Sequence, residues 1–159
     1  MDFKRLIEMA ENTRSIKKQT QMRRQQGKFC SQAEKYCALK LRETLKKYEE
    51  LIIKESDVDV LPGWEIDITI NTPYGWNVAI EWDGAYHRKP IYGEKNLMMR
   101  VIRDDKKDRE LYKKKFVLIR VKDDGRFNPI FVEDKVKRIA EIVETLMESN
   151  VVAYGKIEL

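Results

Sequence analysis

Apolar residues recur at helical spacing in three parts of the chain. The first part runs from about residue 31 to 54, and Ser31 can cap its first turn because Glu34 follows three residues later. The second, from about 96 to 115, is highly charged, and the third runs from about 132 to 147. The pattern therefore predicts three amphipathic helices. The apolar positions of the first and third are Ala33, Cys37, Leu41, Leu45, Tyr48, Val132, Val136, Ala140, Val143 and Met147.

Other segments alternate between apolar and polar residues, as β-strands do. Residues 64–70 and 77–83 alternate strictly, and the segment 71–75 between them contains turn residues, so a β-hairpin is predicted. Residues 116–121 are a short apolar run typical of a buried strand, and residues 151–154 fit a short edge strand. With 159 residues, the chain fits one α/β domain in which helices and strands alternate.

The alternation also separates acidic from apolar side chains on the hairpin. Like charges on neighbouring strands repel each other, and a divalent cation would relieve that repulsion. Mg²⁺ prefers carboxylate oxygens and water, and it can activate a water molecule and stabilise charge on a phosphodiester. We expect Asp67 and Glu81 to bind Mg²⁺, with Mn²⁺ able to substitute; the alternative is a solvated, exposed sheet face. The acidic face comprises Glu65, Asp67, Glu81 and Asp83, and the apolar face Trp64, Ile66, Ile68, Ile70, Val78, Ile80 and Trp82.

The single histidine of the chain, His87, follows shortly after the acidic cluster. Beside candidate metal ligands it is predicted to act as a general acid or base or to position a water molecule, and a structural histidine is the alternative. The two cysteines, Cys30 and Cys37, lie two helical turns apart, which is too distant for a disulfide. A zinc site therefore lacks ligands, and any metal should be bound by oxygen atoms.

The net charge of +5 and the isoelectric point of about 9.1 favour a polyanionic partner. No acidic residue occurs between residues 12 and 33, so residues 1–30 form a basic N-terminal arm that can contact a nucleic-acid backbone; a solvated or disordered tail is the alternative. No apolar stretch has the length of a membrane span, and a cytoplasmic location is expected. The basic residues of the arm are Arg14, Lys17, Lys18, Arg23, Arg24 and Lys28.

A family resemblance is carried by the run Glu81-Trp82-Asp83-Gly84-Ala85-Tyr86-His87. It resembles the E-x-D-G-x-x-H signature of small nucleases related to the very-short-patch-repair endonuclease, within the PD-(D/E)XK superfamily. Further pieces follow the order of the family between about residues 31 and 121. They are an acidic helix position at Glu34, a strand aspartate at Asp67, a D-x-x-[RK]-D-x-x-L helix at Asp104, Lys107, Asp108 and Leu111, and an arginine-containing strand at residues 116–121.

The resemblance implies a restriction-endonuclease-like fold, in which a mixed sheet is flanked by helices on both sides. It also implies divalent-metal-dependent hydrolysis of phosphodiesters. On this basis Asp67 would be the central metal ligand, Glu81 and Asp83 would complete or support the metal shell, and Glu34 would reach in from the first helix.

One position departs from the family pattern. Asp83 stands where the lysine of (D/E)-x-K is expected. The cationic role would have to move to Lys106 or Lys107, and His87 could share it. For each lysine, a place on a solvated charged helix is the alternative.

The sequence thus predicts a Mg²⁺-dependent endonuclease that cleaves duplex DNA, of homing, phage or repair type. Other interpretations stay open: a catalytically silent nucleic-acid-binding protein on the same scaffold, or a nuclease for RNA or branched DNA. One active site cuts one strand, so a double-strand break would call for a homodimer or for two sequential nicks.

Overall fold

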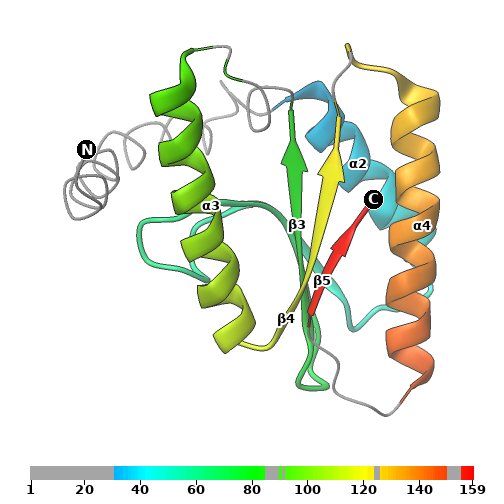
Figure 1. Cartoon of the computed structure of the whole chain (residues 1–159). Helices are drawn as coiled ribbons and strands as arrows, with labels where there is room; N and C mark the ends of the chain where they lie inside the picture. The colour runs from blue at the N-terminus through cyan, green and yellow to red at the C-terminus, as the bar shows by residue number, and fades with distance from the viewer. Residues whose placement is uncertain (1–30, 85–89, 91, 124–125, 150–154) are drawn as a thin grey trace.

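A computed structural model describes residues 31–84, 90, 92–123, 126–149 and 155–159. The strands form a five-stranded sheet in the order β1-β2-β3-β4-β5. β1 and β2, and β2 and β3, pair antiparallel, whereas β3 and β4, and β4 and β5, run parallel. The elements are α2 (Gln32–Thr44), β1 (Ile52–Asp57), β2 (Ile66–Asn71), β3 (Asn77–Asp83), α3 (Glu94–Lys113), β4 (Phe116–Lys122), α4 (Pro129–Glu148) and β5 (Gly155–Glu158) (Figure 1).

Helices cover both faces of this mixed sheet, which confirms the predicted α/β class. Figure 1 shows α3 on one side of the sheet and α2 with α4 on the other. The larger apolar cluster joins α2 and α4 to one sheet face, with Leu41, Ile80 and Ile139 fully buried. The smaller cluster lies under α3, where Leu111 packs with Leu118. Among the described residues, no helix combines the length and apolarity needed to cross a membrane.

The first helix begins as predicted but ends early. The hydroxyl of Ser31 accepts a hydrogen bond from the N–H of Glu34 at 3.1 Å, which caps α2. The helix ends at Thr44 rather than near residue 54, and residues 52–57 form β1, a strand that the periodicity missed. Tyr48, predicted on the helix stripe, lies in the connection and packs against the larger cluster. The isoleucines that open β1 favour a strand because their branched side chains pack well on a sheet.

The predicted hairpin of β2 and β3 is confirmed, but its strict alternation is wrong at one end. Ile68 and Ile80 share the larger cluster, whereas Ile66 and Trp64 belong to the cluster under α3, away from Trp82. The ladder is irregular here: between the pairs Glu55–Ile68 and Asp57–Ile66, Ser56 has a φ of 48°. Such a left-handed residue disturbs the pleat that alternation assumes.

The second half of the chain follows the prediction closely. α3, β4 and α4 lie within a few residues of the predicted bounds, and the side chain of Asn128 caps α4 ahead of Pro129. The predicted edge strand at residues 151–154 lies outside the described residues. The described C-terminal strand, β5, pairs in parallel with β4 from Gly155 to Glu158.

Candidate active site

The acidic residues of the hairpin gather at one end of the sheet. Because β3 and β4 are parallel, their carboxyl ends meet at the same edge, and the antiparallel β2 begins there. Asp67 therefore comes from the start of β2, Glu81 and Asp83 from the end of β3, and Arg120 from β4. All four are buried, with no more than 8% of each residue exposed. α3 covers this face of the sheet (Figure 1), and Lys107 on α3 contacts Glu81.

Asp67 is tied to the backbone of β3. Its carboxylate oxygen Oδ2 accepts a hydrogen bond from the N–H of Trp82 at 2.8 Å. The paired residues of β2 run from Ile68 to Asn71. The side chain of Asp67 therefore links β2 to β3 just beyond the last backbone pair. The contact holds Asp67 next to Glu81, and its negative charge acts on that carboxylate.

Lys107 provides the cation nearest to Glu81. Its Nζ donates to Oε1 of Glu81 and to the backbone carbonyl of Glu65. Only 2% of Lys107 is exposed, so the amine is enclosed between α3 and the sheet. Of the two lysines considered from the sequence, Lys107 faces the carboxylates, while Lys106 is on the exposed side of α3.

Burial raises the pKa of Glu81 from 4.5 to about 7. The charge of Asp67 also raises it, whereas Lys107 and Arg120 act in the opposite direction. A carboxyl with such a pKa can change its protonation state near neutral pH, a property that concentrates at functional sites.

The raised pKa of Glu81 should make the stability of the metal-free protein depend on pH. A carboxyl with a higher pKa in the folded than in the unfolded state contributes fully below about pH 4.5. That contribution is lost as the pH rises to about 7. The variant Glu81→Gln cannot titrate, so its free energy of unfolding should lack this decline. Chemical denaturation of both proteins across this pH range measures the effect, and parallel pH profiles would contradict the raised pKa.

Asp83 pairs with Arg120, whereas Glu81 pairs with Lys107. Both of its oxygens accept hydrogen bonds from Nη1 of Arg120, at 2.8 and 3.1 Å. Arg120 also binds Asp108 on α3, and Lys156 contacts Asp108 at 3.2 Å. Burial alone would lower the pKa of Arg120, but the hydrogen bond to Asp108 and the charges of Asp83 and Glu81 raise it above its ordinary value.

The structure thus brings some of the predicted site residues together. Asp67, Glu81 and Lys107 form one group, with Asp83 beside them in the ion pair with Arg120. Glu34 is buried at the start of α2, in the layer on the opposite side of the sheet from α3. His87 and the arm residues Arg14, Lys17, Lys18, Arg23, Arg24 and Lys28 lie outside the described residues.

The contribution of Arg120 was not recognised from the sequence. The motif match included an arginine at this strand position and an aspartate at Asp108, but it gave no reason to pair them. An arginine in the otherwise apolar run from Phe116 to Val121 is the signal that could have been used, because a buried guanidinium needs carboxylate partners.

Asp67 and Glu81 fit a hard divalent cation. They offer carboxylate oxygens, and a cation would relieve the repulsion between them. In the described part of the chain, no group of three or more His, Cys, Asp or Glu side chains is arranged to hold a metal ion. Mg²⁺, however, commonly keeps several waters and is bound through one or two carboxylates together with substrate phosphates. Two carboxylates are therefore sufficient donors for this ion.

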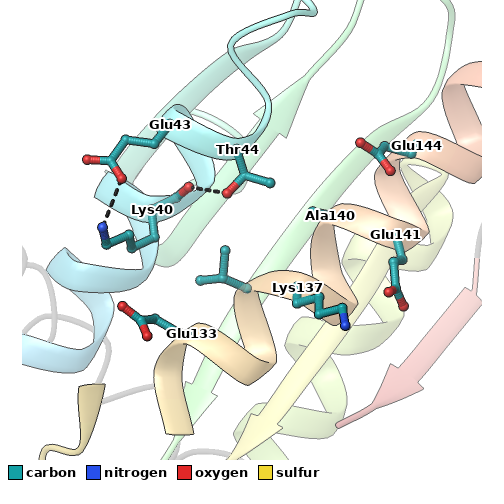
Figure 2. Close-up of a pocket in the computed structure, with 9 residues that line it drawn as sticks. Lys40, Glu43, Thr44, Glu133, Lys137, Ala140, Glu141 and Glu144 are labelled. Carbon is teal, nitrogen blue, oxygen red and sulfur yellow. Dashed lines mark hydrogen bonds and ion pairs between the residues drawn. The ribbon is translucent and has the colours of Figure 1, made fainter. Parts of the chain in front are cut away.

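A separate groove of about 540 Å³ opens between α2 and α4, in the layer opposite α3 (Figure 2). Two of its carboxylates already have partners: Glu43 pairs with Lys40 at 2.9 Å, and Glu133 accepts a hydrogen bond from the hydroxyl of Tyr36 at 2.6 Å. Its position sets it apart from the Asp67–Glu81 pair. The lining residues are Lys40, Glu43, Thr44, Glu133, Val136, Lys137, Ala140, Glu141 and Glu144.

Comparisons of the chain with protein-family models, curated proteins and solved structures find no match.

Proposed function

We propose that the protein is a divalent-metal-dependent nuclease that hydrolyses phosphodiester bonds in DNA. The observation that carries this proposal is the buried group formed by Asp67, Glu81 and Lys107 at the carboxyl end of β3. Two carboxylates can hold a hard cation that activates water, and a lysine amine can stabilise negative charge on a phosphate. The order of helix, three strands, helix and strand from α2 to β4 agrees with a PD-(D/E)XK core.

Asp67 and Glu81 would hold Mg²⁺ or Mn²⁺. When bound, the ion would activate a water molecule and stabilise negative charge on the phosphate. The chain itself contributes orientation: the N–H of Trp82 holds the carboxylate of Asp67, and the enclosed setting strengthens charge interactions.

Lys107 supports an active enzyme over the silent alternative. That alternative was motivated by the missing lysine of (D/E)-x-K, because Asp83 occupies its position. The amine of Lys107 reaches the carboxylate of Glu81 from α3 instead. There it can stabilise the charge that develops on a phosphate, as preorganised cations do in phosphoryl transfer.

A basic stripe leads away from this site along α3. Arg103 and Arg100 precede Lys107 by one and two helical turns, so they share its side of the helix. The guanidinium of Arg103 stands 5.8 Å from the ring centre of Trp64, and that of Arg100 stands 5.4 Å from Tyr92. Stacked arginines bind phosphate well, so the stripe fits the backbone of a nucleic acid.

The direct test is incubation of the purified chain with supercoiled plasmid and Mg²⁺ or Mn²⁺. Nicked or linear DNA should appear and should be absent when a chelator is added. Conversion to nicked circles only would indicate one active site on one strand, whereas early linear product would indicate a homodimer. Single-stranded and structured RNA, offered in parallel, separate the RNA alternative. Binding without cleavage of any of these polymers would favour the silent protein.

The basic arm should supply much of the affinity for the phosphate backbone and little of the chemistry. The slope of log affinity against log salt is negative. Arg23→Gln together with Arg24→Gln should make it shallower by about 0.9 for each phosphate that the arm no longer neutralises. Cleavage at saturating enzyme should persist. The matched control is Lys113→Gln with Lys114→Gln, an equal charge change at the C-terminal end of α3. A changed slope only in that control would locate the phosphate-binding surface there.

A further inference from the structure

Two buried cations lie between α3 and the sheet, and each has its own carboxylate partners. Lys107 contacts Glu81, whereas Arg120, which is 4% exposed, holds Asp83 and Asp108. Nη1 of Arg120 donates to both oxygens of Asp83, and Nε and Nη2 donate to the two oxygens of Asp108. Three nitrogens of the guanidinium are therefore engaged by two carboxylates.

The strand register gives Arg120 another available partner. It lies directly opposite Glu81 in the parallel ladder of β3 and β4, and its charge acts on Glu81. Side chains opposite each other on neighbouring strands are normally in reach. Arginine binds carboxylates through two parallel hydrogen bonds, so an unrestrained Arg120 could cover both oxygens of Glu81. Its hydrogen bonds run to Asp83 and Asp108 instead.

We infer that Asp83 and Asp108 are positioning residues that hold Arg120 away from Glu81. Lysine is a compact charge, and Lys107 contacts one oxygen of Glu81, Oε1, whereas a bidentate arginine would occupy both. Asp108 directly follows Lys107 on α3, so its ion pair with Arg120 also fixes the helix beside the amine. Glu81 is thereby kept accessible to a metal ion, and Asp83 is not itself a ligand. The consequence for metal binding rests on the proposed function.

Mn²⁺ affinity of the full chain without substrate, measured by calorimetry, tests this inference. Asp83→Asn and Asp108→Asn should each weaken Mn²⁺ binding by about tenfold, because the released Arg120 moves onto Glu81. Removing the arginine as well should reverse this weakening, so Asp83→Asn/Arg120→Gln should bind Mn²⁺ as tightly as Arg120→Gln alone. If Asp83→Asn still weakens binding in the Arg120→Gln background, Asp83 is a ligand and the inference is overturned.

Lys156→Gln is the matched control for Asp108. Lys156 contacts the same carboxylate at 3.2 Å, but its side chain is 46% exposed and lies outside the buried network. Its replacement should leave Mn²⁺ affinity unchanged. If the charge of Asp108 acted directly on the ion rather than through Arg120, loss of the neighbouring Lys156 cation would raise Mn²⁺ affinity, and that outcome would also overturn the inference.

A second measurement needs no metal. In the wild-type protein Lys107 should react slowly with an amine-acylating reagent, and in Asp108→Asn it should react faster because Arg120 displaces it from Glu81. The buried thiol of Cys37, in the opposite layer, should stay protected from a thiol-alkylating reagent, and this protection reports an intact fold. Unchanged labelling of Lys107 overturns the inference even if Mn²⁺ binds. A wild-type protein that binds no Mn²⁺ overturns the proposed metal site and leaves the labelling to decide. If Asp108→Asn exposes Cys37, the Mn²⁺ affinities of the variants that carry Arg120→Gln decide.

Discussion

Asp67→Asn is expected to abolish plasmid cleavage while the fold is retained. The amide has nearly the shape of the carboxylate, and its oxygen can still accept the N–H of Trp82, which is 2.8 Å from Oδ2 in the wild-type protein. The substitution removes the charge that would hold the metal ion. Because a bound metal contributes several kcal/mol to phosphodiester cleavage, the rate should fall by at least about 10²-fold. Initial rates with saturating Mg²⁺ measure the decrease.

The matched control for this prediction is Asp57→Asn. Asp57 is also a buried carboxylate, 4% exposed, but it lies outside the candidate site and accepts a hydrogen bond from the hydroxyl of Thr69 at 2.6 Å. Its replacement should lower stability and leave cleavage near the wild-type rate. Glu81→Gln should behave like Asp67→Asn. Cleavage by Asp67→Asn within a few-fold of wild type would remove Asp67 from the active site.

Local patterns were sufficient to predict most of the elements but not all of them. The hairpin was readable because alternation and turn residues agree, and Gly75 takes the positive φ of 84° that such a turn favours. β1 was missed because no glycine or proline marks the end of α2, and apolar residues up to Tyr48 kept a helical period. Only pairing with β2 makes residues 52–57 a strand, and that pairing is a long-range property.

The candidate site was predictable to a similar extent. Asp67 and Glu81 follow from alternation on two neighbouring strands. The choice of Lys107 over Lys106 could have been made from the sequence, because Lys107 precedes Leu111 by four residues and so shares its buried helix face.

The partner of Asp83 could not be predicted in this way. β4 is buried on both faces, so its pattern does not say which face Arg120 occupies. Only the register that places Arg120 opposite Glu81 brings the guanidinium to the acidic face.

Lys107→Met is expected to lower both activity and stability. Removal of a preorganised cation from the reacting phosphate should reduce the cleavage rate by about 10²–10³-fold. Breaking a buried ion pair also leaves Glu81 without its nearest cation, which should cost about 3–5 kcal/mol of unfolding free energy at alkaline pH. Without the lysine the pKa of Glu81 rises further, so stability should be greater at low pH and decline as the pH rises. Denaturation at several pH values, together with cleavage rates, measures both effects.

Two further variants separate the chemical from the structural role of Lys107. Lys106→Met makes the same change at the neighbouring, exposed position and should leave stability and turnover close to wild type. In Lys107→Met/Glu81→Gln the buried charge is removed as well, so stability should recover while cleavage stays absent. If Lys107→Met retained cleavage with a lowered stability, the amine would be a structural partner of Glu81, and the cation for the phosphate would have to come from another residue, for which His87 is the first candidate.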